Sequence, residues 1–234
     1  MSRIRGGASR LIQGIQHFQE RVFGSKKSLF HRLGEGQEPL ALFITCSDSR
    51  INPNLLTQTE PGELFILRNA GNLVPPFGVH GGEAATLEYA IKQLHIQDVI
   101  VCGHSKCGAM QGLLALDTLH EMPEVAAWLE HARAILPAIE KDAATLSPAD
   151  RLNLAIERNV LLQLEHLKTY PFVADGLSAG RLRLHGWIYY LESGEVTAHV
   201  PGHAPFMPLA EAMRSRLAHA SWGSPDHTIL GESM

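Results

Sequence analysis

The 234-residue sequence predicts an α/β protein with a mainly parallel central sheet flanked by helices. Apolar, strand-like runs occur at residues 39–45, 63–68 and 98–102, and a helical pattern over 83–94 lies between the second and third runs. Strand, helix and strand in succession are typical of a right-handed parallel unit. Hydrophobic residues make up 45% of the chain, which is enough apolar material for a sizeable core.

The first 33 residues are expected to form a helical arm. Apolar residues recur at helical spacing from Leu11 to Phe23, so that residues from about 8 to 33 predict one or two amphipathic helices. Their apolar face must pack either on the chain's own domain or on a neighbouring subunit. Residues 34–200 are expected to form the α/β core and 201–234 a C-terminal tail, all within one domain.

Further elements follow the second strand. Residues 71–82 predict a loop long enough to suggest a function. Helices are predicted over 109–116, over 123–142 with a kink at Pro137, and from Ser147 to Tyr170. Alternation over 182–190 and 196–200 around a Ser193-Gly194 turn predicts a hairpin at an edge of the sheet. The pattern weakens after Pro201, and the last roughly twenty residues are expected to be mobile.

Composition and charge narrow the classes of function. The formal net charge of −4 gives no support to a nucleic-acid or anionic-membrane partner. No run approaches the roughly 18 apolar residues of a membrane span, and residues 1–10 lack the apolar segment of a secretory signal. Three cysteines without a C-x-x-C motif favour a reducing cytoplasm in which the thiols stay free.

Metal-ligating residue types follow two of the predicted strands. Cys46 ends the first strand, and His104 and Cys107 follow the third. Because ligands gather at the carboxyl ends of parallel strands, the two loops are expected to converge. Two thiols and an imidazole form a zinc site with one position open. Either cysteine alone would more often be a core residue, and Cys102, within its apolar run, is interpreted as one.

The sequence alone does not decide which group takes the fourth position of this site. Asp48 lies two residues after Cys46, so its carboxylate could approach the ion, or Arg50 could hold it back. In the second arrangement the carboxylate would accept the proton of zinc-bound water and orient the oxygen. A histidine could also close the site. A phosphate loop is excluded, because Ala109 stands where the motif requires Lys.

Four motifs together resemble the β-class carbonic anhydrases. They are Cys46-Ser-Asp-Ser-Arg50, Pro61-Gly-Glu-Leu-Phe65, Arg68-Asn-Ala-Gly-Asn72 and Cys102-Gly-His-Ser-Lys-Cys-Gly108. The similarity runs from about Leu11 to Trp187. It implies that one Zn²⁺ per chain is bound by Cys46, His104 and Cys107, and that Asp48 and Arg50 form a catalytic dyad.

The implied reaction is reversible hydration of carbon dioxide to bicarbonate and a proton, through zinc-bound hydroxide oriented by the dyad. Two alternatives are kept. One is a hydrolase of carbon disulfide or carbonyl sulfide on the same fold. The other is a catalytically silent zinc-binding scaffold, which the presence of Asp48 and Arg50 disfavours.

The resemblance is to the plant and cyanobacterial branch of the family. It implies that Gln37 binds carbon dioxide or bicarbonate, that Phe65, Ala70 and Tyr89 form an apolar pocket wall, and that Gly108 lies beside the ion. The other branch carries a Trp shortly before the first zinc cysteine, as part of a bicarbonate-regulated site. Residues 43–45 lack it here, so we expect no such regulation and an open zinc at neutral pH.

The resemblance also implies partners. Members of the family form a homodimer or a higher homo-oligomer in which the N-terminal helices embrace the neighbouring subunit. We expect the same here, with no nucleic acid and no membrane partner. The expected location is the cytoplasm, with a carboxysome as the alternative.

Overall fold

The computed structural model describes residues 7–142, 145–202 and 206–218, in two compact units, Met1–Glu38 and Pro39–Met234. In the first unit the expected arm is helical throughout most of its described length. Its segments are α1 (Gly7–His17), η1 (Phe18–Val22), α2 (Phe23–Ser25) and α3 (Lys27–Glu35). None of their residues is buried. The expectation of a single domain stays a prediction.

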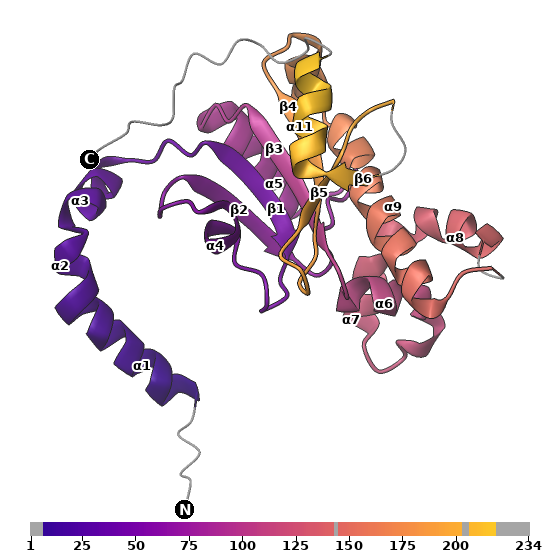
Figure 1. The fold of residues 1–234 in the computed structure, drawn as a ribbon, viewed down its shortest axis with the longest axis horizontal. Coiled ribbons are helices and arrows are strands. Elements are labelled where there is room, and N and C mark those ends of the chain that lie inside the picture. Colours follow the sequence, from indigo (N-terminus) through magenta and orange to yellow (C-terminus); the bar gives the residue numbers. More distant parts are fainter. Residues whose placement is uncertain (1–6, 143–144, 203–205, 219–234) are drawn as a thin grey trace, which may run out of the picture. The chain divides into compact units, whose positions relative to one another are not determined.

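The second unit contains a six-stranded sheet of order β2-β1-β3-β4-β5-β6 (Figure 1). The strands are β1 (Ala41–Cys46), β2 (Leu64–Asn69), β3 (Asp98–His104), β4 (Arg183–Tyr189), β5 (Val196–His199) and β6 (Phe206–Pro208). The first four strands run parallel, and β5 and β6 are antiparallel. This confirms the predicted fold class.

The edge of the sheet differs from the prediction in one detail. The β4–β5 hairpin forms as expected, but β6 pairs outside β5, with Met207 opposite Ala198. The hairpin is therefore one strand away from the edge. A strand of three residues is too short to produce an alternating pattern, which is why the sequence did not reveal it.

Helices and helical turns connect the strands. They are α4 (Pro53–Thr57), α5 (Gly82–Glu88), η2 (Tyr89–Gln93), α6 (Gly108–Leu114), η3 (Leu116–Thr118), α7 (Pro123–Leu129), η4 (Glu130–Ile135), α8 (Leu136–Asp142), α9 (Pro148–Lys168), α10 (Pro171–Ser178) and α11 (Leu209–Ala218). Among the described residues, no helix combines the length and the apolar composition needed to cross a bilayer.

Two helical predictions need correction. The helix expected over 123–142 is three segments, and its geometry changes at Glu130 and again at Leu136, directly before Pro137. Pro137 lies in the first turn of α8, where a missing N–H costs nothing. In the region of weak pattern after Pro201, β6 and α11 are regular elements. The final residues that we expected to be mobile, 219–234, lie outside the described residues.

The core lies between the sheet and the long helix α9. Leu42, Ile44 and Cys46 share one face of β1 and belong to the large core that α9 completes. Phe43 and Cys102 face the opposite side. Cys102 is fully buried, which raises the pKa of its thiol to about 12 and confirms its interpretation as a core residue.

α9 packs on β3 and β4 (Figure 1). Its approach requires glycine on both strands. A Cβ at Gly103 would lie 2.8 Å from Val160 Cγ2, and one at Gly186 would lie 3.0 Å from Val160 Cγ1. The close packing fixes α9 relative to the strand ends at which the candidate site is built.

We expect Gly103→Ala to lower the free energy of unfolding by about 1–3 kcal/mol, because the added methyl overpacks the contact with Val160 and Ile156. Urea denaturation of the metal-free protein measures the change. Gly82→Ala is the matched control, because a Cβ at that position meets no atom within 4 Å. Equal stability of the two variants would contradict the close packing of α9.

Candidate metal centre

Two thiols and one imidazole meet at the carboxyl edge of the sheet. Cys46 is the last residue of β1, His104 is the last of β3, and Cys107 immediately precedes α6. The parallel register pairs Thr45 with Cys102, so the two strands end at the same level. The ligand atoms of Cys46, His104 and Cys107 lie within 4.8 Å of one another, and all three residues are buried. The structure thus brings together the three predicted ligands.

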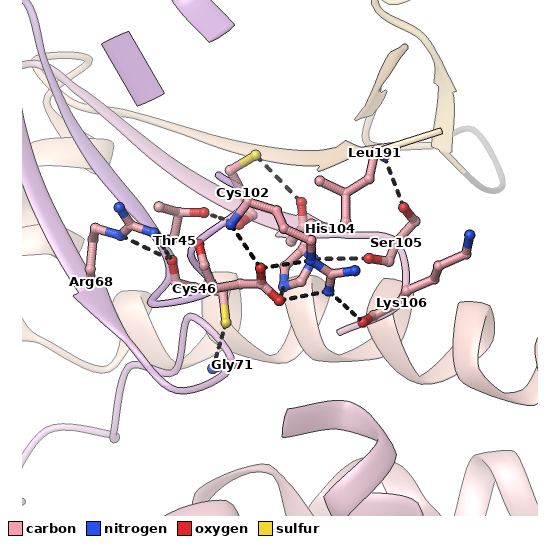
Figure 2. A network of polar contacts seen from close by, with 12 residues as sticks. Thr45, Cys46, Arg68, Gly71, Cys102, His104, Ser105, Lys106 and Leu191 are labelled. Atoms are coloured by element: carbon pink, nitrogen blue, oxygen red, sulfur yellow. Dashed lines mark hydrogen bonds and ion pairs between the residues drawn. The ribbon is translucent and has the colours of Figure 1, made fainter. Parts of the chain in front are cut away.

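The imidazole of His104 has one ring nitrogen that could bind a metal ion. Its Nδ1 lies 2.9 Å from the carbonyl oxygen of Ser105, to which it donates (Figure 2). In that tautomer Nε2 carries a free lone pair. Nε2 is buried and has no hydrogen-bond partner. Since buried polar atoms are nearly always partnered, this atom and the two thiols fit a zinc ion.

The two thiols affect each other's ionisation. The interaction with Cys107 lowers the pKa of Cys46 against the opposing effect of burial, and His104 and the backbone N–H of Gly71 lower it further. The same interaction with Cys46, together with burial, raises the pKa of Cys107. The pair therefore already stabilises one thiolate, the form in which cysteine binds metals.

Asp48 and Arg50 form the predicted pair beside this cluster. Arg50 Nε donates to Asp48 Oδ1 at 2.9 Å, and Nη2 donates to Oδ2 at 2.7 Å. These bonds from Arg50 hold the pKa of Asp48 well below its usual range. Asp48 Oδ2 lies 4.0 Å from His104 Nε2. The carboxylate is thus ionised and held by Arg50 at the border of the cluster.

Arg68 is a site residue that sequence reasoning quoted only as part of a motif. Its guanidinium donates to the carbonyl of Cys46 at 3.0 and 3.1 Å and to the carbonyl of Asp48 at 2.8 Å. Figure 2 shows it beside Cys46. Arg68 thereby fixes the backbone on both sides of Ser47. No local pattern distinguishes this arginine, because its partners belong to the neighbouring strand.

A second cluster that the sequence did not reveal holds the loop after β3. Ser105 Oγ donates to Glu192 at 2.6 Å and accepts from the N–H of Leu191, and Lys106 pairs with Glu192 at 2.8 Å. Lys106 and Ser105 lower the pKa of Glu192 to about 2. The carbonyl of Lys106, whose φ is 56°, accepts from Arg50 Nη2 at 3.2 Å. This cluster connects the loop between His104 and Cys107 to the pair of Asp48 and Arg50.

The residues expected to line a substrate pocket fall into two groups. Ala70 and Gly108 are exposed next to the cluster, since Ala70 precedes the glycine that contacts Cys46 and Gly108 follows Cys107. A Cβ at Gly108 would meet no atom within 4 Å, so the space beside it is open.

The aromatic pair lies elsewhere on the chain. The rings of Phe65 and Tyr89 are 6.0 Å apart. Phe65 pairs with Leu42, four residues before Cys46 along β1, which corresponds to about 13 Å. The backbone of Phe65 thus lies about four residues before the carboxyl end of β1, and the pocket role of this pair stays a prediction. Gln37 belongs to the N-terminal unit, and its role stays a prediction.

We expect His104→Ala to lose most of its zinc, because the free Nε2 is the ligand that completes the set. Metal content after dialysis, measured by plasma mass spectrometry, gives the result. His120→Ala, which changes an exposed histidine outside the cluster, is the control and should keep about one zinc per chain. Full zinc occupancy in His104→Ala would refute the ligand assignment.

Comparison with known proteins identifies the family of this chain. The family model described as carbonic anhydrase matches residues 41–196. A carbonic anhydrase of Synechococcus elongatus is 52% identical over 189 residues, which cover 80% of this chain and 70% of the relative. One of Pseudomonas aeruginosa is 46% identical over 220 residues, covering 94% and 98%. The solved β-carbonic anhydrase CcaA matches with a TM-score of 0.84 at 48% identity, covering 86% and 98%. The chain therefore belongs to the β-class carbonic anhydrase family.

Proposed function

We propose that this protein is a zinc-dependent carbonate dehydratase, which hydrates carbon dioxide reversibly to bicarbonate and a proton. The observation that carries the proposal is the buried Cys46, His104 and Cys107 cluster beside a carboxylate that Arg50 holds with two hydrogen bonds. Membership of the carbonic anhydrase family supports it. A scaffold that only binds zinc would have no use for the held carboxylate.

Cys46, His104 and Cys107 would hold the metal as two thiolates and one neutral imidazole. When bound, zinc lowers the pKa of a water ligand to about 7 and so supplies a nucleophile at neutral pH. Ser105 keeps the lone pair of His104 Nε2 available by accepting from Nδ1. Arg68 keeps the Cys46 backbone in place.

Asp48 orients the attacking water. Because Arg50 keeps it ionised, its oxygens only accept hydrogen bonds. It can therefore accept a hydrogen bond from the water, so that a lone pair of the water oxygen faces the carbon of the substrate. A C–O bond forms as one C=O π bond of carbon dioxide breaks and its electron pair moves to the oxygen, and the proton lost by the water passes to solvent. Arg50 also donates to the carbonyl of Lys106, which ties the orientation of Asp48 to the loop that carries two ligands.

Ala70 and Gly108 supply the open, weakly polar space that carbon dioxide needs next to the cluster. Phe65 on β2 lies opposite Leu42, about 13 Å along β1 from Cys46, and the ring of Tyr89 on η2 lies 6.0 Å from that of Phe65. Their pocket role therefore belongs to a site shared with a second copy. We propose that the side-chain amide of Gln37 donates a hydrogen bond to the substrate oxygen that gains negative charge.

A homodimer or a higher homo-oligomer is part of the same proposal. The arm helices leave Leu11, Ile12 and Ile15 more than half exposed, and a second copy of the chain would cover such a face. We further propose a cytoplasmic location, with carboxysome association as the alternative, and no control of the open fourth position by bicarbonate.

Stopped-flow hydration of carbon dioxide, on protein of known zinc content, tests the function. We expect turnover in proportion to bound zinc. Hydrolysis of carbon disulfide or carbonyl sulfide without hydration of carbon dioxide would identify the hydrolase alternative. Full zinc occupancy without either activity would identify a silent scaffold.

We expect Arg50→Ala to reduce kcat/KM by about 10- to 100-fold with the fold and the zinc content retained. The loss corresponds to the two charge-assisted hydrogen bonds that orient Asp48. Arg50→Lys should rescue little, because an ammonium cannot bind both carboxylate oxygens as a fork. Arg133→Ala, which breaks an exposed pair with Glu130, is the control. Wild-type kcat/KM in Arg50→Ala would remove the dyad from the mechanism.

We expect Gln37→Ala to reduce kcat/KM for carbon dioxide by about 10-fold or more, the effect of losing one hydrogen bond to a developing charge. Zinc content should not change, because Gln37 is not a ligand. Gln97→Ala, at an exposed position before β3, serves as the matched control. If the two variants have the same kcat/KM, Gln37 does not contact the substrate.

A further inference from the structure

One peptide unit beside the cluster is bonded at both ends. The N–H of Gly71 donates to Cys46 Sγ at 3.4 Å (Figure 2). The carbonyl of the same peptide belongs to Ala70, and it accepts from Trp128 Nε1 at 2.8 Å. Trp128 lies on α7, far from β1 and β2 in the sequence. An indole N–H is thus connected to a candidate metal ligand through a single peptide.

The next peptide is held as well. Asn159 Nδ2, from α9, donates to the carbonyl of Gly71 at 2.9 Å. Asn159 is in turn fixed by Gln163, whose Nε2 donates to its Oδ1 at 2.8 Å and whose Oε1 accepts from the N–H of Val74. Both amides are buried. Burying an amide side chain costs free energy unless it is hydrogen-bonded, so the hydrogen bonds of Asn159 and Gln163 to the loop backbone offset the cost of their burial.

The loop beside Cys46 has an uncommon backbone conformation. Gly71 has φ 81° and Asn72 has φ 51°, two successive left-handed residues. A side chain at position 71 would in addition meet Ala109 Cβ at 3.0 Å. The N–H of Asn72 closes a turn on the carbonyl of Asn69 at 3.5 Å, and the side chain of Asn69 bonds both the N–H and the carbonyl of Leu73. Trp128 and Asn159 add to this turn by holding the carbonyls of Ala70 and Gly71.

We propose that Trp128 is a positioning residue of the metal centre, whose indole N–H acts through the Ala70–Gly71 peptide to direct and strengthen the Gly71 hydrogen bond to the Cys46 sulfur. The C=O and N–H of a peptide belong to one conjugated unit, so a donor on the oxygen strengthens the N–H as a donor. A stronger N–H···S bond draws charge from the thiolate and orients its lone pairs. The inference rests on the proposed role of Cys46 as a zinc ligand.

A merely structural role for Trp128 is the competing explanation. Its ring packs against the large core and makes an edge contact with His131 at 5.4 Å between centroids. Trp128→Phe separates the two roles, because it keeps an aromatic ring and removes only the N–H. Trp187→Phe is the matched control, since Trp187 packs on Phe43 at the opposite face of the sheet.

The experiment uses Co²⁺ in place of zinc and reads the sulfur-to-cobalt charge-transfer band. Trp128→Phe should move the band to lower energy, because Cys46 becomes a stronger donor when its hydrogen bond weakens. Zinc affinity, measured by competition with a chelator, should fall by about 10-fold, because the loss of the bond that orients the Cys46 sulfur outweighs its greater donor strength. Trp187→Phe should match the wild type in both measurements.

An unchanged charge-transfer band and an unchanged zinc affinity in a folded Trp128→Phe protein would overturn this inference. They would not contradict the proposed zinc site. A wild-type chain that takes up no cobalt would overturn the inference and the proposed function together. If Trp128→Phe does not fold, NMR spectroscopy of the ¹¹³Cd-substituted wild-type protein tests the inference instead. A scalar coupling between the metal and the Gly71 amide proton is expected, and its absence overturns the inference.

Discussion

The parallel pairing of β1 with β3 is the constraint on which the candidate site depends. It aligns Thr45 with Cys102, so that Cys46 and His104 reach the same edge of the sheet although they are distant in sequence. A slip of one residue would turn Cys46 to the opposite face, away from the other ligands. The packing of α9 against the glycines of β3 and β4 holds these two strands against the helix.

Side chains from distant elements hold the loops that carry the site. Arg68 fixes the backbone from Cys46 to Asp48, and Glu192 holds the loop after β3 through Ser105. Trp128 bonds the peptide that faces the Cys46 sulfur. Loop backbone has no ladder partners, so buried donors and acceptors must be satisfied by side chains. These bonds would preorganise the three side chains for a metal ion, which reduces the cost of ordering on binding.

Much of the fold followed from periodicity. The strands at 41–46, 64–69 and 98–104 lie within a few residues of the predicted runs, because buried strands have continuous apolar sequences. Prediction of secondary structure was weaker where an element is too short to show a pattern, as for β6. It was also weaker where tertiary contacts determine the helix geometry, as at Glu130. The pocket role of Phe65 and Tyr89 was implied by the family resemblance. A resemblance implies a role for a residue, but it does not say how far that residue lies from the cluster of its own chain.

The sequence by itself determined the chemistry available to this protein: two free thiols and one imidazole directly after apolar strands, with an acid and an arginine two residues apart. Only the tertiary structure decided how these groups act. It left His104 Nε2 without a partner, placed both Asp48 oxygens on Arg50, and brought Arg68 and Trp128 to the ligand loops. The reason is physical. Residue types and local spacing are properties of the chain, whereas the partner of a buried polar atom depends on which distant elements pack against it.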